Sequence, residues 1–470
     1  MSARAPAGAA TVLALLAVLG GALVGGCTAD DEGGDGRDRA GGGTTAPPSR
    51  AGTPPAEPGP GPPELPEPPE LPELPELVVV GHATRPPPPL GAAAANRLTE
   101  GTATRWRGRR VLRATAPAAA RRAVRRVERD PELLAVVPVD VVGPTIAVAR
   151  VAGRDPVRDA PQAVHVTVVG DVMPVRGVPD AAAALAPMAR RLRSADLTVG
   201  NLETTLSRAG APTQGGDSFG AGPGLLGPLR RSGFDVLSLA NNHAGDFGTR
   251  ALLETVQALR RSPVRPVGAG RDLSAAGRPA YVEAGGTRFA LIGFNAIGET
   301  PRATPGAPGA LSVRMPPRTG PLVGADVDHV TGLIRRAERR ADVVVVLPHW
   351  GTQYTHEPEP VQRRVSRALV AAGADLVVGG HPHWVQGVDV VDGVPVLHSL
   401  GNFVFDMDFM EQTLQGVVLE ATFWGAELKA LRLVPYAMDP VTFAPREARG
   451  TVGEEILADV WAASTGPFAR

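Results

Sequence analysis

Five short apolar runs, each typical of a β-strand, end in residues whose side chains bind metal ions. Those residues are Asp171, Glu203, Asn242 with His243, His349, and His381 with His383. In an open α/β sheet, ligands bind in the crevice outside the carboxyl ends of the strands. Four of the nine histidines are therefore directed at one place, and we predict a site for two divalent metal ions there.

The chemistry that such a pair of ions supports is hydrolysis. Two cations about 3.5–4 Å apart hold both the attacking and the leaving oxygen, and they lower the pKa of a bridging water. Glu203 is predicted to bridge the two ions, and Asp171 to bind the first one. The other predicted ligands are Asn242, through its amide oxygen, His349 and His381 for the second ion, and His383 for the first. We predict Mn, Fe or Zn as the metal.

His243 directly follows a predicted ligand, so its side chain should point in a different direction from that of Asn242. It is predicted to protonate the leaving group. Asp246, three residues further on, is predicted to orient the imidazole and to keep its pKa near the working pH. The candidate substrate-binding residues are Asn201, Asn241, Arg176 and Asn402.

Each of these residues, taken alone, also has a purely structural explanation. A buried histidine satisfied by backbone groups is more common than a metal ligand. Asp171 is suited to cap a helix, Glu203 is suited to begin one, and Asn241 and Asn242 are common turn formers. Arg176 is also a candidate for a solvated surface residue. The metal interpretation depends on all of these groups meeting at strand ends.

The composition excludes several other kinds of chemistry. Lys429 is the only lysine, so the chain has no Gly-Lys-Ser/Thr phosphate loop, and we expect neither ATP use through that motif nor Schiff-base chemistry. Cys27 is the only cysteine, which excludes disulfides within the chain, thiolate metal sites and a cysteine nucleophile in the globular part. The 48 basic and 48 acidic residues give a net charge of zero, so no binding to nucleic acid is expected.

Cys27 also marks the predicted end of a signal peptide. An early arginine, the apolar run 11–24 and the sequence Val24-Gly25-Gly26-Cys27 resemble a bacterial lipoprotein signal in residues 1–27, with lipidation of the Cys27 thiol after cleavage. The alternative is an ordinary secretory signal with an incidental cysteine. In the first case the protein is anchored to the outer face of the bacterial cell membrane, and in both cases it is exported.

The rest of the chain divides into four segments. Residues 28–76 are rich in proline and glycine and predict a disordered linker. Residues 77–159 mix short strand and helix patterns, which predicts an accessory α/β region of unknown role. From 160 to 410, strand-like runs alternate with helical patterns, as in βαβ units around a buried sheet. Residues 411–470 add strands and a final helix that complete this domain.

Six sequence motifs occur in order between about 164 and 406. They are Gly-Asp-Val-Met at 170–173, Gly-Asn-Leu-Glu at 200–203, Ala-Asn-Asn-His-Ala-Gly-Asp-Phe-Gly at 240–248, His-Trp-Gly at 349–351, Gly-Gly-His-Pro-His at 379–383 and Leu-Gly-Asn-Phe-Val-Phe at 400–405. In these motifs the chain resembles the CapA family of capsule and poly-γ-glutamate synthesis proteins, relatives of the calcineurin-like metallophosphoesterases. The resemblance implies a metallophosphoesterase-like four-layer α/β/β/α sandwich with metal-binding loops at one edge, in a membrane-tethered protein that faces outward.

Two positions depart from the patterns of those families. Metallophosphoesterases carry Asp-x-His in the first motif, whereas Met173 stands here in place of the histidine. The first metal is therefore expected to be held weakly or to be absent. The CapA pattern has a glutamate where this chain has Gln353. The predicted ligands of the second metal are unaffected: Glu203, Asn242, His349 and His381.

The resemblance implies an exported lipoprotein that acts in capsule or poly-γ-glutamate assembly or export and carries a phosphoesterase-like hydrolytic site. Because polymer ligation needs ATP and no ATP motif is present, synthesis itself would belong to partner proteins. Two alternatives stay open: a cell-envelope metallophosphoesterase unrelated to capsule, and a non-catalytic module that binds an anionic polymer through the metal site. The expected substrate or ligand is accordingly a phosphoester or an anionic polymer.

Overall fold

The computed structural model describes residues 76–470. Cys27, the predicted signal peptide and nearly all of the predicted linker lie outside these residues, so the predictions of export, lipidation and a linker are not tested by the structure. Within residues 76–470, no helix is both long enough and apolar enough to cross a membrane.

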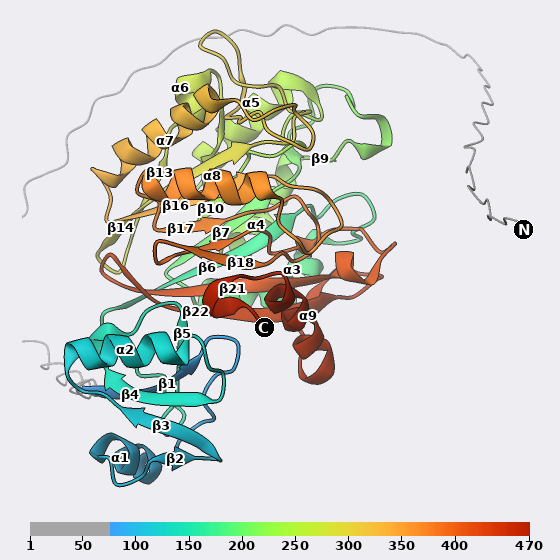
Figure 1. Cartoon of the computed structure of the whole chain (residues 1–470). Helices are drawn as coiled ribbons and strands as arrows, with labels where there is room; N and C mark the ends of the chain where they lie inside the picture. Colours follow the sequence, from blue (N-terminus) through green and yellow to red (C-terminus); the bar gives the residue numbers. More distant parts are fainter. Residues whose placement is uncertain (1–75) are drawn as a thin grey trace, which may run out of the picture. The chain divides into compact units, whose positions relative to one another are not determined.

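The accessory region, residues 77–159, forms a small sheet with a helix on each face (Figure 1). The sheet has the order β2-β3-β4-β1-β5. Its strands are β1 (Leu77–His82), β2 (Arg105–Trp106), β3 (Arg109–Arg113), β4 (Leu133–Pro138) and β5 (Ile146–Val148), and its helices are α1 (Ala92–Glu100) and α2 (Pro117–Val127). Alternate residues of β4 point to opposite faces, so Leu133 packs under α2 and Leu134 under α1. The predicted accessory α/β segment is confirmed.

Two larger sheets make up the rest of the protein. The eight-stranded sheet has the order β11-β10-β7-β6-β21-β22-β23, with β20 also paired to β6. These strands are β6 (Ala163–Val172), β7 (Leu197–Leu202), β10 (Val236–Ser238), β11 (Arg265–Val267), β20 (Asn402–Val404), β21 (Gln415–Trp424), β22 (Glu427–Met438) and β23 (Pro445–Glu447). The six-stranded sheet has the order β13-β14-β16-β17-β19-β18, with β13 (Ala280–Ala284), β14 (Thr287–Asn295), β16 (Val343–His349), β17 (Leu376–Val378), β18 (Val388–Val391) and β19 (Val394–Leu397).

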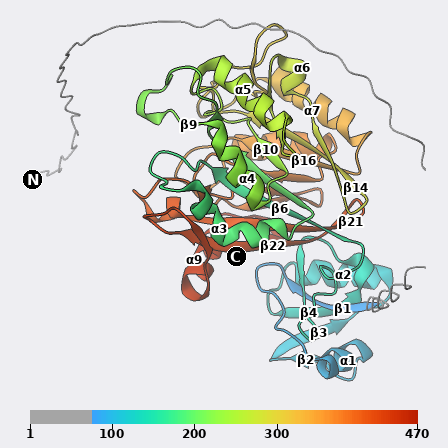
Figure 2. The same cartoon turned by 180° about the vertical axis from the view of Figure 1, so that it is seen from behind.

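The two sheets pack face to face, and helices cover both outer faces. Apolar side chains of both sheets, such as Val166 and Val345, form one buried core between them. On the outside, α3 (Ala181–Arg193), α4 (Leu226–Ser232) and α5 (Gly248–Arg260) pack on the eight-stranded sheet (Figure 2). On the other side, α6 (Leu273–Ala276), α7 (Gly324–Glu338) and α8 (Pro360–Ala371) pack on the six-stranded sheet (Figure 1). The predicted four-layer α/β/β/α sandwich is confirmed.

The remaining elements are short or close the core. Helix α9 (Gly450–Ala462) buries Ile456 and Val460 in the core between the sheets. Two small ladders join β8 (Thr205–Leu206) to β9 (Gly220–Ala221) and β12 (Ala269–Gly270) to β15 (Gly309–Ala310). Single 3₁₀ turns lie at Val139–Val141, Gly215–Asp217, Pro223–Leu225, Glu411–Leu414 and Gly466–Phe468.

Local sequence explains why these elements form where they do. The seven residues of β16, four of them consecutive valines, are all buried, as expected for a strand covered on both faces. In α5 the buried residues Ala251, Leu252, Val256 and Leu259 follow the helical period and make one apolar stripe. Asp180 caps α3 by accepting hydrogen bonds from the backbone N–H groups of the first turn.

Strand direction brings the predicted ligands to one edge. Strands β6, β7 and β10 are parallel neighbours, and so are β14, β16 and β17. The carboxyl ends within each set therefore lie together, and the face-to-face packing of the sheets brings the two sets to the same crevice. His349 is the last residue of β16, and Asp171 is the second-last residue of β6.

Away from this edge, a buried polar network ties the six-stranded sheet to the C-terminus. Asp389 of β18 accepts hydrogen bonds from His398 Nε2 (2.9 Å), Arg363 Nε (3.0 Å) and Thr465 Oγ1 (2.6 Å). Burial alone raises the pKa of Asp389, but the hydrogen bond and charge of His398 and the other two donors outweigh burial and bring the pKa to about 2. His398 is thus a structural residue.

This network predicts a pH-dependent contribution to stability. Asp389→Asn should lower the free energy of unfolding at pH 7 by about 2–3 kcal/mol, because it removes a buried charged acceptor. A carboxylate with a lowered folded-state pKa stabilises the protein above its ordinary pKa of 3.8 and loses this effect as the pH falls to about 2. Chemical denaturation should therefore show the difference between the variant and the wild type shrinking below pH 4. The matched control is Asp392→Asn in the exposed β18–β19 turn; a loss as large in this control would contradict the account.

Candidate metal site

The buried carboxylates Asp171 and Glu203 form the centre of the crevice, together with His349. One possible ligand atom from each of these three residues lies within 4.8 Å of the others. Asp171 and Glu203 are wholly buried, and His349 is nearly so. Within residues 76–470, the only basic side chains paired with either carboxylate are histidines, His349 at 3.2 Å from Glu203 and His383 at 3.7 Å from Asp171. The crevice thus concentrates negative charge without an arginine or lysine to balance it.

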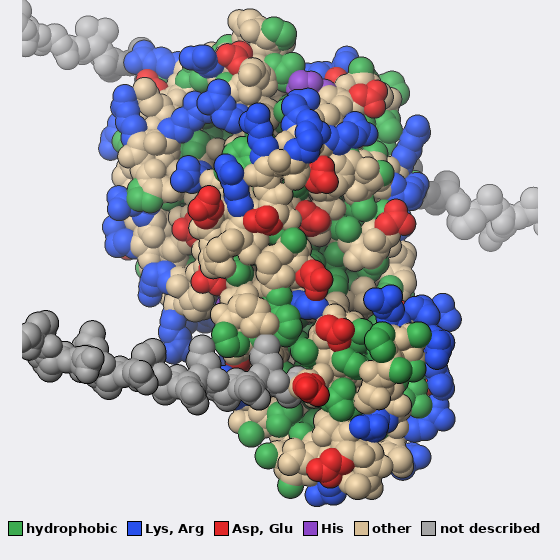
Figure 3. Space-filling view, turned by 90° about the vertical axis from the view of Figure 1, so that its left-hand side faces the viewer, with side chains coloured by type: hydrophobic (Ala, Val, Ile, Leu, Met, Phe, Trp, Pro, Cys, Tyr) green, Lys and Arg blue, Asp and Glu red, His purple; other side chains and the backbone are tan. Residues whose placement is uncertain are grey.

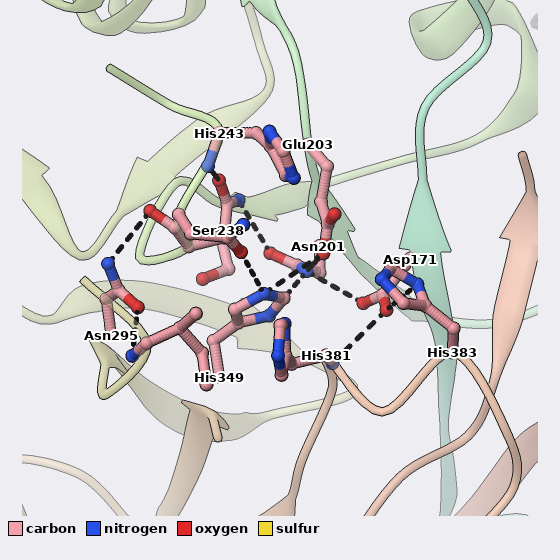
Figure 4. A network of polar contacts seen from close by, with 12 residues as sticks. Asp171, Asn201, Glu203, Ser238, His243, Asn295, His349, His381 and His383 are labelled. Carbon is pink, nitrogen blue, oxygen red and sulfur yellow. Dashed lines mark hydrogen bonds and ion pairs between the residues drawn. The ribbon is translucent and has the colours of Figure 1, made fainter. Parts of the chain in front are cut away.

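A chain of asparagine amides fixes the orientation of both carboxylates (Figure 4). The side-chain Oδ1 of Asn241 accepts the backbone N–H of His243, so its Nδ2 must be the donor to Asn201 Oδ1 at 2.9 Å. Asn201 Nδ2 is then directed at Asp171 Oδ1 (2.8 Å) and Glu203 Oε1 (2.9 Å). Asn201 and Asn241, predicted to contact substrate, are placed by the structure between the elements of the site, where they hold the carboxylates.

The four residues predicted to bind the second metal lie together. His349 Nε2 is 2.8 Å from Asn242 Oδ1 and 3.2 Å from Glu203 Oε1, and the rings of His349 and His381 are 4.9 Å apart. Two buried atoms of this group, Glu203 Oε2 and His381 Nδ1, have no hydrogen-bond partner. Buried polar atoms without partners are uncommon, and each requires an explanation such as an ion.

Burial sets the protonation of these groups in a way that favours a cation. It lowers the pKa of His349 and of His381 well below the usual value, and neighbouring histidines add to this effect. Both imidazoles are therefore neutral at pH 7, the state that binds a metal. His381 Nδ1 has no partner, whereas the His349 nitrogens lie 3.1 Å from Asn201 Nδ2 and 2.8 Å from Asn242 Oδ1. Burial, and next the charge of Asp171, raise the pKa of Glu203 well above its usual value. A divalent cation would remove the cost of holding these two carboxylates close together.

The glycine at position 380 lets the Asp171 carboxylate lie close against the backbone. A Cβ atom on Gly380 would lie 2.7 Å from Asp171 Oδ1 and 3.5 Å from His349 Nδ1. The next residues turn sharply, since His381 and His383 have φ angles of 98° and 61° on either side of Pro382. Such angles are costly for a residue with a side chain, and they persist where the surrounding structure imposes them. The oxygen and nitrogen donors and the unpaired atoms fit a divalent metal ion.

The residues predicted to bind the first metal lie beside this group, and the protein holds one atom of each. His383 Nδ1 lies 2.8 Å from Asn402 Oδ1, and Asp171 Oδ2 accepts the backbone N–H of His381 at 3.2 Å. Met173 is wholly buried in a small apolar cluster with Phe219 and Phe405. Apolar side chains therefore occupy the place from which a histidine would reach the first metal.

His243 and Asp246 form the predicted pair. His243 Nδ1 is 2.9 Å from Asp246 Oδ2, and the same carboxylate accepts the backbone N–H of Phe219 at 2.7 Å and a hydrogen bond from Gln214. The Phe219 ring stacks on the imidazole with centroids 4.0 Å apart. His243 is the most exposed of the four histidines at the site, although only 7% of its surface is exposed.

The last two predicted substrate-binding residues are engaged within the protein. Arg176 forms a bidentate ion pair with Asp406, and its guanidinium lies over the Phe219 ring at 4.3 Å. Asn402 is wholly buried, and its Nδ2 donates to the carbonyl of Thr413 at 3.0 Å. Asn402 therefore orients His383, whereas Nη1 of Arg176 has only the Asp217 carboxylate nearby, at 3.8 Å.

Sequence reasoning missed several residues that support the site. Gln214 and Phe219 lie in a glycine-rich stretch that ends no strand, so nothing in their spacing marks them. Asn295, the last residue of β14, donates to the carbonyl of Asn241 at 3.1 Å, and its position at a strand end is a signal that was available. Tyr354 stacks near His383, with ring centroids 6.0 Å apart.

Comparisons with known proteins agree with the motifs. The family model described as bacterial capsule synthesis protein PGA_cap matches residues 165–407, just over half of the chain. The PGA biosynthesis protein CapA of Bacillus subtilis is 37% identical over 180 residues, which cover 38% of this chain and 44% of that protein. The capsule biosynthesis protein CapA of Bacillus anthracis is 37% identical over 179 residues, 38% of this chain and 42% of that one. The chain thus spans less than half the length of these curated relatives.

One solved structure, named as a putative 5′-nucleotidase, is only remotely similar. A putative 5′-nucleotidase from Staphylococcus aureus has 16% sequence identity and a TM-score of 0.38, over 63% of this chain and 57% of that one. A similarity at this level carries no argument about function.

The close approach of Asp171 and His349 to Gly380 gives a direct test of the site. Gly380→Ala should raise the dissociation constant for Mn²⁺ about tenfold or more, because the added methyl group would press on Asp171 and His349. Gly380 has a backbone conformation that alanine also adopts, so the variant should fold. Isothermal titration calorimetry measures the effect, with Gly324→Ala as control, where a methyl group meets nothing within 4 Å. Equal Mn²⁺ affinity in both variants would show that the ion binds elsewhere.

Proposed function

The chain belongs to the bacterial capsule synthesis protein family PGA_cap, and from this premise we propose that it acts in capsule or poly-γ-glutamate assembly or export through a metal-dependent, phosphoesterase-like hydrolytic site. The relatives named above support a role in capsule or polymer assembly, since their names refer to capsule and PGA biosynthesis. The hydrolytic site is supported by the geometry of the crevice in this chain.

The observation that carries the proposal is the pair of buried atoms without partners, Glu203 Oε2 and His381 Nδ1. A carboxylate oxygen and a neutral imidazole nitrogen are ligands for the same ions. They belong to the same group of buried side chains as Asn242 and His349. A structural explanation for any one residue does not account for four donors converging at strand ends.

We assign the ligands to two unequal positions. Glu203, Asn242, His349 and His381 would hold the tighter ion. Asp171 and His383 would hold a weaker one, because Met173 supplies no third donor there. The Asn402 contact at Nδ1 orients the His383 ring and leaves Nε2 for the ion. A bound divalent ion supplies Lewis-acid polarisation of a substrate oxygen and lowers the pKa of water. Mn, Fe and Zn are the candidate metals.

The proton transfer falls to His243. Asp246 holds Nδ1, which fixes the ring and leaves Nε2 to carry the proton that a leaving oxygen requires. Asp246 is itself held by the Phe219 backbone N–H and by Gln214, so it cannot turn away from the imidazole. Stacking on Phe219 limits the remaining rotation of the ring. A phosphoester is the substrate class that these groups suit best.

The proposal extends to the location of the protein in the cell and to its partners. Cleavage before Cys27 and lipidation of its thiol would anchor the protein to the outer face of the cell membrane, with the proline-rich residues 28–76 as a spacer. The chain has no Gly-Lys-Ser/Thr phosphate loop, so ATP-driven ligation of the polymer would belong to partner proteins of the capsule machinery. The two alternatives, a capsule-independent phosphoesterase and a non-catalytic polymer binder, are separated by the test below.

The proposal is tested on the full-length protein with bis(p-nitrophenyl) phosphate and supplied Mn²⁺. The wild type should bind metal and release nitrophenolate. His243→Ala should keep its bound metal and lose about 100-fold or more in kcat on diphenyl phosphate, the usual contribution of a general acid. The loss should be smaller on bis(p-nitrophenyl) phosphate, because nitrophenolate is a weakly basic leaving group that needs little protonation. His329→Ala, on an exposed position of α7, removes a histidine remote from the crevice and should match the wild type.

The other outcomes separate the alternatives. Bound metal without turnover in any of the three proteins would contradict the hydrolytic site and support a non-catalytic binder. Turnover by the wild type, together with normal capsule in cells that lack the protein, would favour a phosphoesterase unrelated to capsule.

A further inference from the structure

The zero net charge of the chain conceals an uneven distribution. The accessory region 77–159 contains fifteen arginines and seven acidic residues, whereas residues 160–470 contain 29 basic and 30 acidic residues. Residues 1–76 are acidic, with four arginines and eleven acidic residues. A strongly basic region within a neutral chain indicates an interaction with an anion, which the total charge did not reveal.

Helix α2 carries the densest part of this charge. Five arginines on and just beyond this helix are exposed, and we call them the arginine face: Arg121, Arg122, Arg125, Arg126 and Arg129. The opposite side of α2 buries Ala120, Ala123 and Val127 against the sheet, which holds the arginine face toward solvent. Figure 3 shows Lys and Arg side chains gathered along one side of the accessory region.

Nothing in the described part of the chain neutralises these arginines. Across residues 76–470, none of the five guanidinium groups forms an ion pair. The nearest acidic residue in sequence, Glu128, instead accepts a hydrogen bond from Thr145 at 2.6 Å. Arg250 on α5 shows the contrasting arrangement, because Glu254 pairs with it one turn further along. Like charges at this spacing repel one another, so the arginine face costs stability unless it has a partner.

We propose that the arginine face is a binding surface for an anionic polymer with regularly spaced carboxylates, of which γ-linked polyglutamate is the example. The inference rests on the proposed function for the identity of the polymer. The rise of an α-helix places residue 121 roughly 6 Å from residue 125 along the axis, and residue 122 the same distance from residue 126. A γ-linked repeat has five backbone bonds where an α-linked residue has three, so it spans about 6 Å when extended. Each such pair of arginines therefore matches one carboxylate per repeat.

An anionic membrane is the competing partner, and the surface around α2 does not suit it. A helix that binds at a membrane inserts apolar side chains between the lipids. The apolar side of α2 is already buried within the accessory region. The large exposed hydrophobic residues of 76–470 are Phe409, Met410, Val441 and Val452, all outside the accessory region. A dissolved polymer needs no such insertion.

The test compares two sets of charge-removing substitutions in the full-length protein. Arg121→Gln, Arg125→Gln and Arg126→Gln together remove three charges from the arginine face. The control combines Arg335→Gln, Arg336→Gln and Arg339→Gln, three exposed arginines on α7. Fluorescence polarisation with labelled poly-γ-glutamate at low salt measures affinity. The first set should raise the dissociation constant roughly tenfold, as expected for three exposed ion pairs, and the control should change it less than twofold.

Two further measurements make the result decisive. Replacing the same three residues of the arginine face with lysine should restore most of the binding, because lysine keeps the charge, and added salt should weaken binding by the wild type. The same proteins are tested for sedimentation with phosphatidylglycerol vesicles. Equal polymer affinity in the wild type and the glutamine variant would overturn the proposal. The proposal would also be overturned if the glutamine variant lost vesicle binding while its polymer binding stayed unchanged. That result would identify the surface as a membrane contact.

The outcome is independent of the hydrolytic site. Bound Mn²⁺ and phosphodiester turnover are measured on the same preparations and should not differ between the wild type and the glutamine variant. If the wild type binds polymer through the arginine face but has no turnover, the hydrolytic proposal fails and this inference stands. If turnover is present and the arginine substitutions leave polymer binding unchanged, this inference alone fails.

Discussion

Asp171 and Glu203 are buried close together at the carboxyl edge of the eight-stranded sheet, and their mutual repulsion is the constraint on which the rest of the site depends. Removing two carboxylates from water without a compensating charge is costly, and the raised pKa of Glu203 expresses that cost. Asn201 offsets part of this cost, because it donates hydrogen bonds to both carboxylates. Glu203 Oε2 has no hydrogen-bond partner, so the protein alone does not offset the whole desolvation cost.

Both sheets contribute residues to the edge at which the site lies. The eight-stranded sheet supplies Asp171 and Glu203, and the six-stranded sheet brings His349 and the turn that contains His381 and His383. Neither sheet alone assembles the donor set, so the core between the two sheets also determines the geometry of the site. A change that shifts one sheet against the other should therefore affect metal affinity before it unfolds the protein.

Much of this arrangement was predictable, because it follows from strand direction and residue type. The runs of buried valine predicted strands such as β16, and ligand-forming residues at their ends predicted where the side chains would meet. The roles of individual side chains were less accessible. Nothing in the spacing of Arg176 reveals its pairing with Asp406, 230 residues away, and the orientation of Asn201 depends on a chain of donors and acceptors that only the folded protein assembles. The basic charge of the accessory region can be counted from the sequence, but the net charge of the whole chain is zero and gives no sign of it.

The central claim, that the crevice holds a metal ion at one strong and one weaker position, is tested most directly by anomalous X-ray diffraction from crystals grown with Mn²⁺. The account predicts the strongest anomalous peak within bonding distance of Glu203 Oε2 and His381 Nδ1, and a weaker peak beside Asp171 and His383. A protein crystallised with excess Mn²⁺ that shows no anomalous peak in this crevice, with Glu203 Oε2 and His381 Nδ1 bonded to water alone, would contradict it.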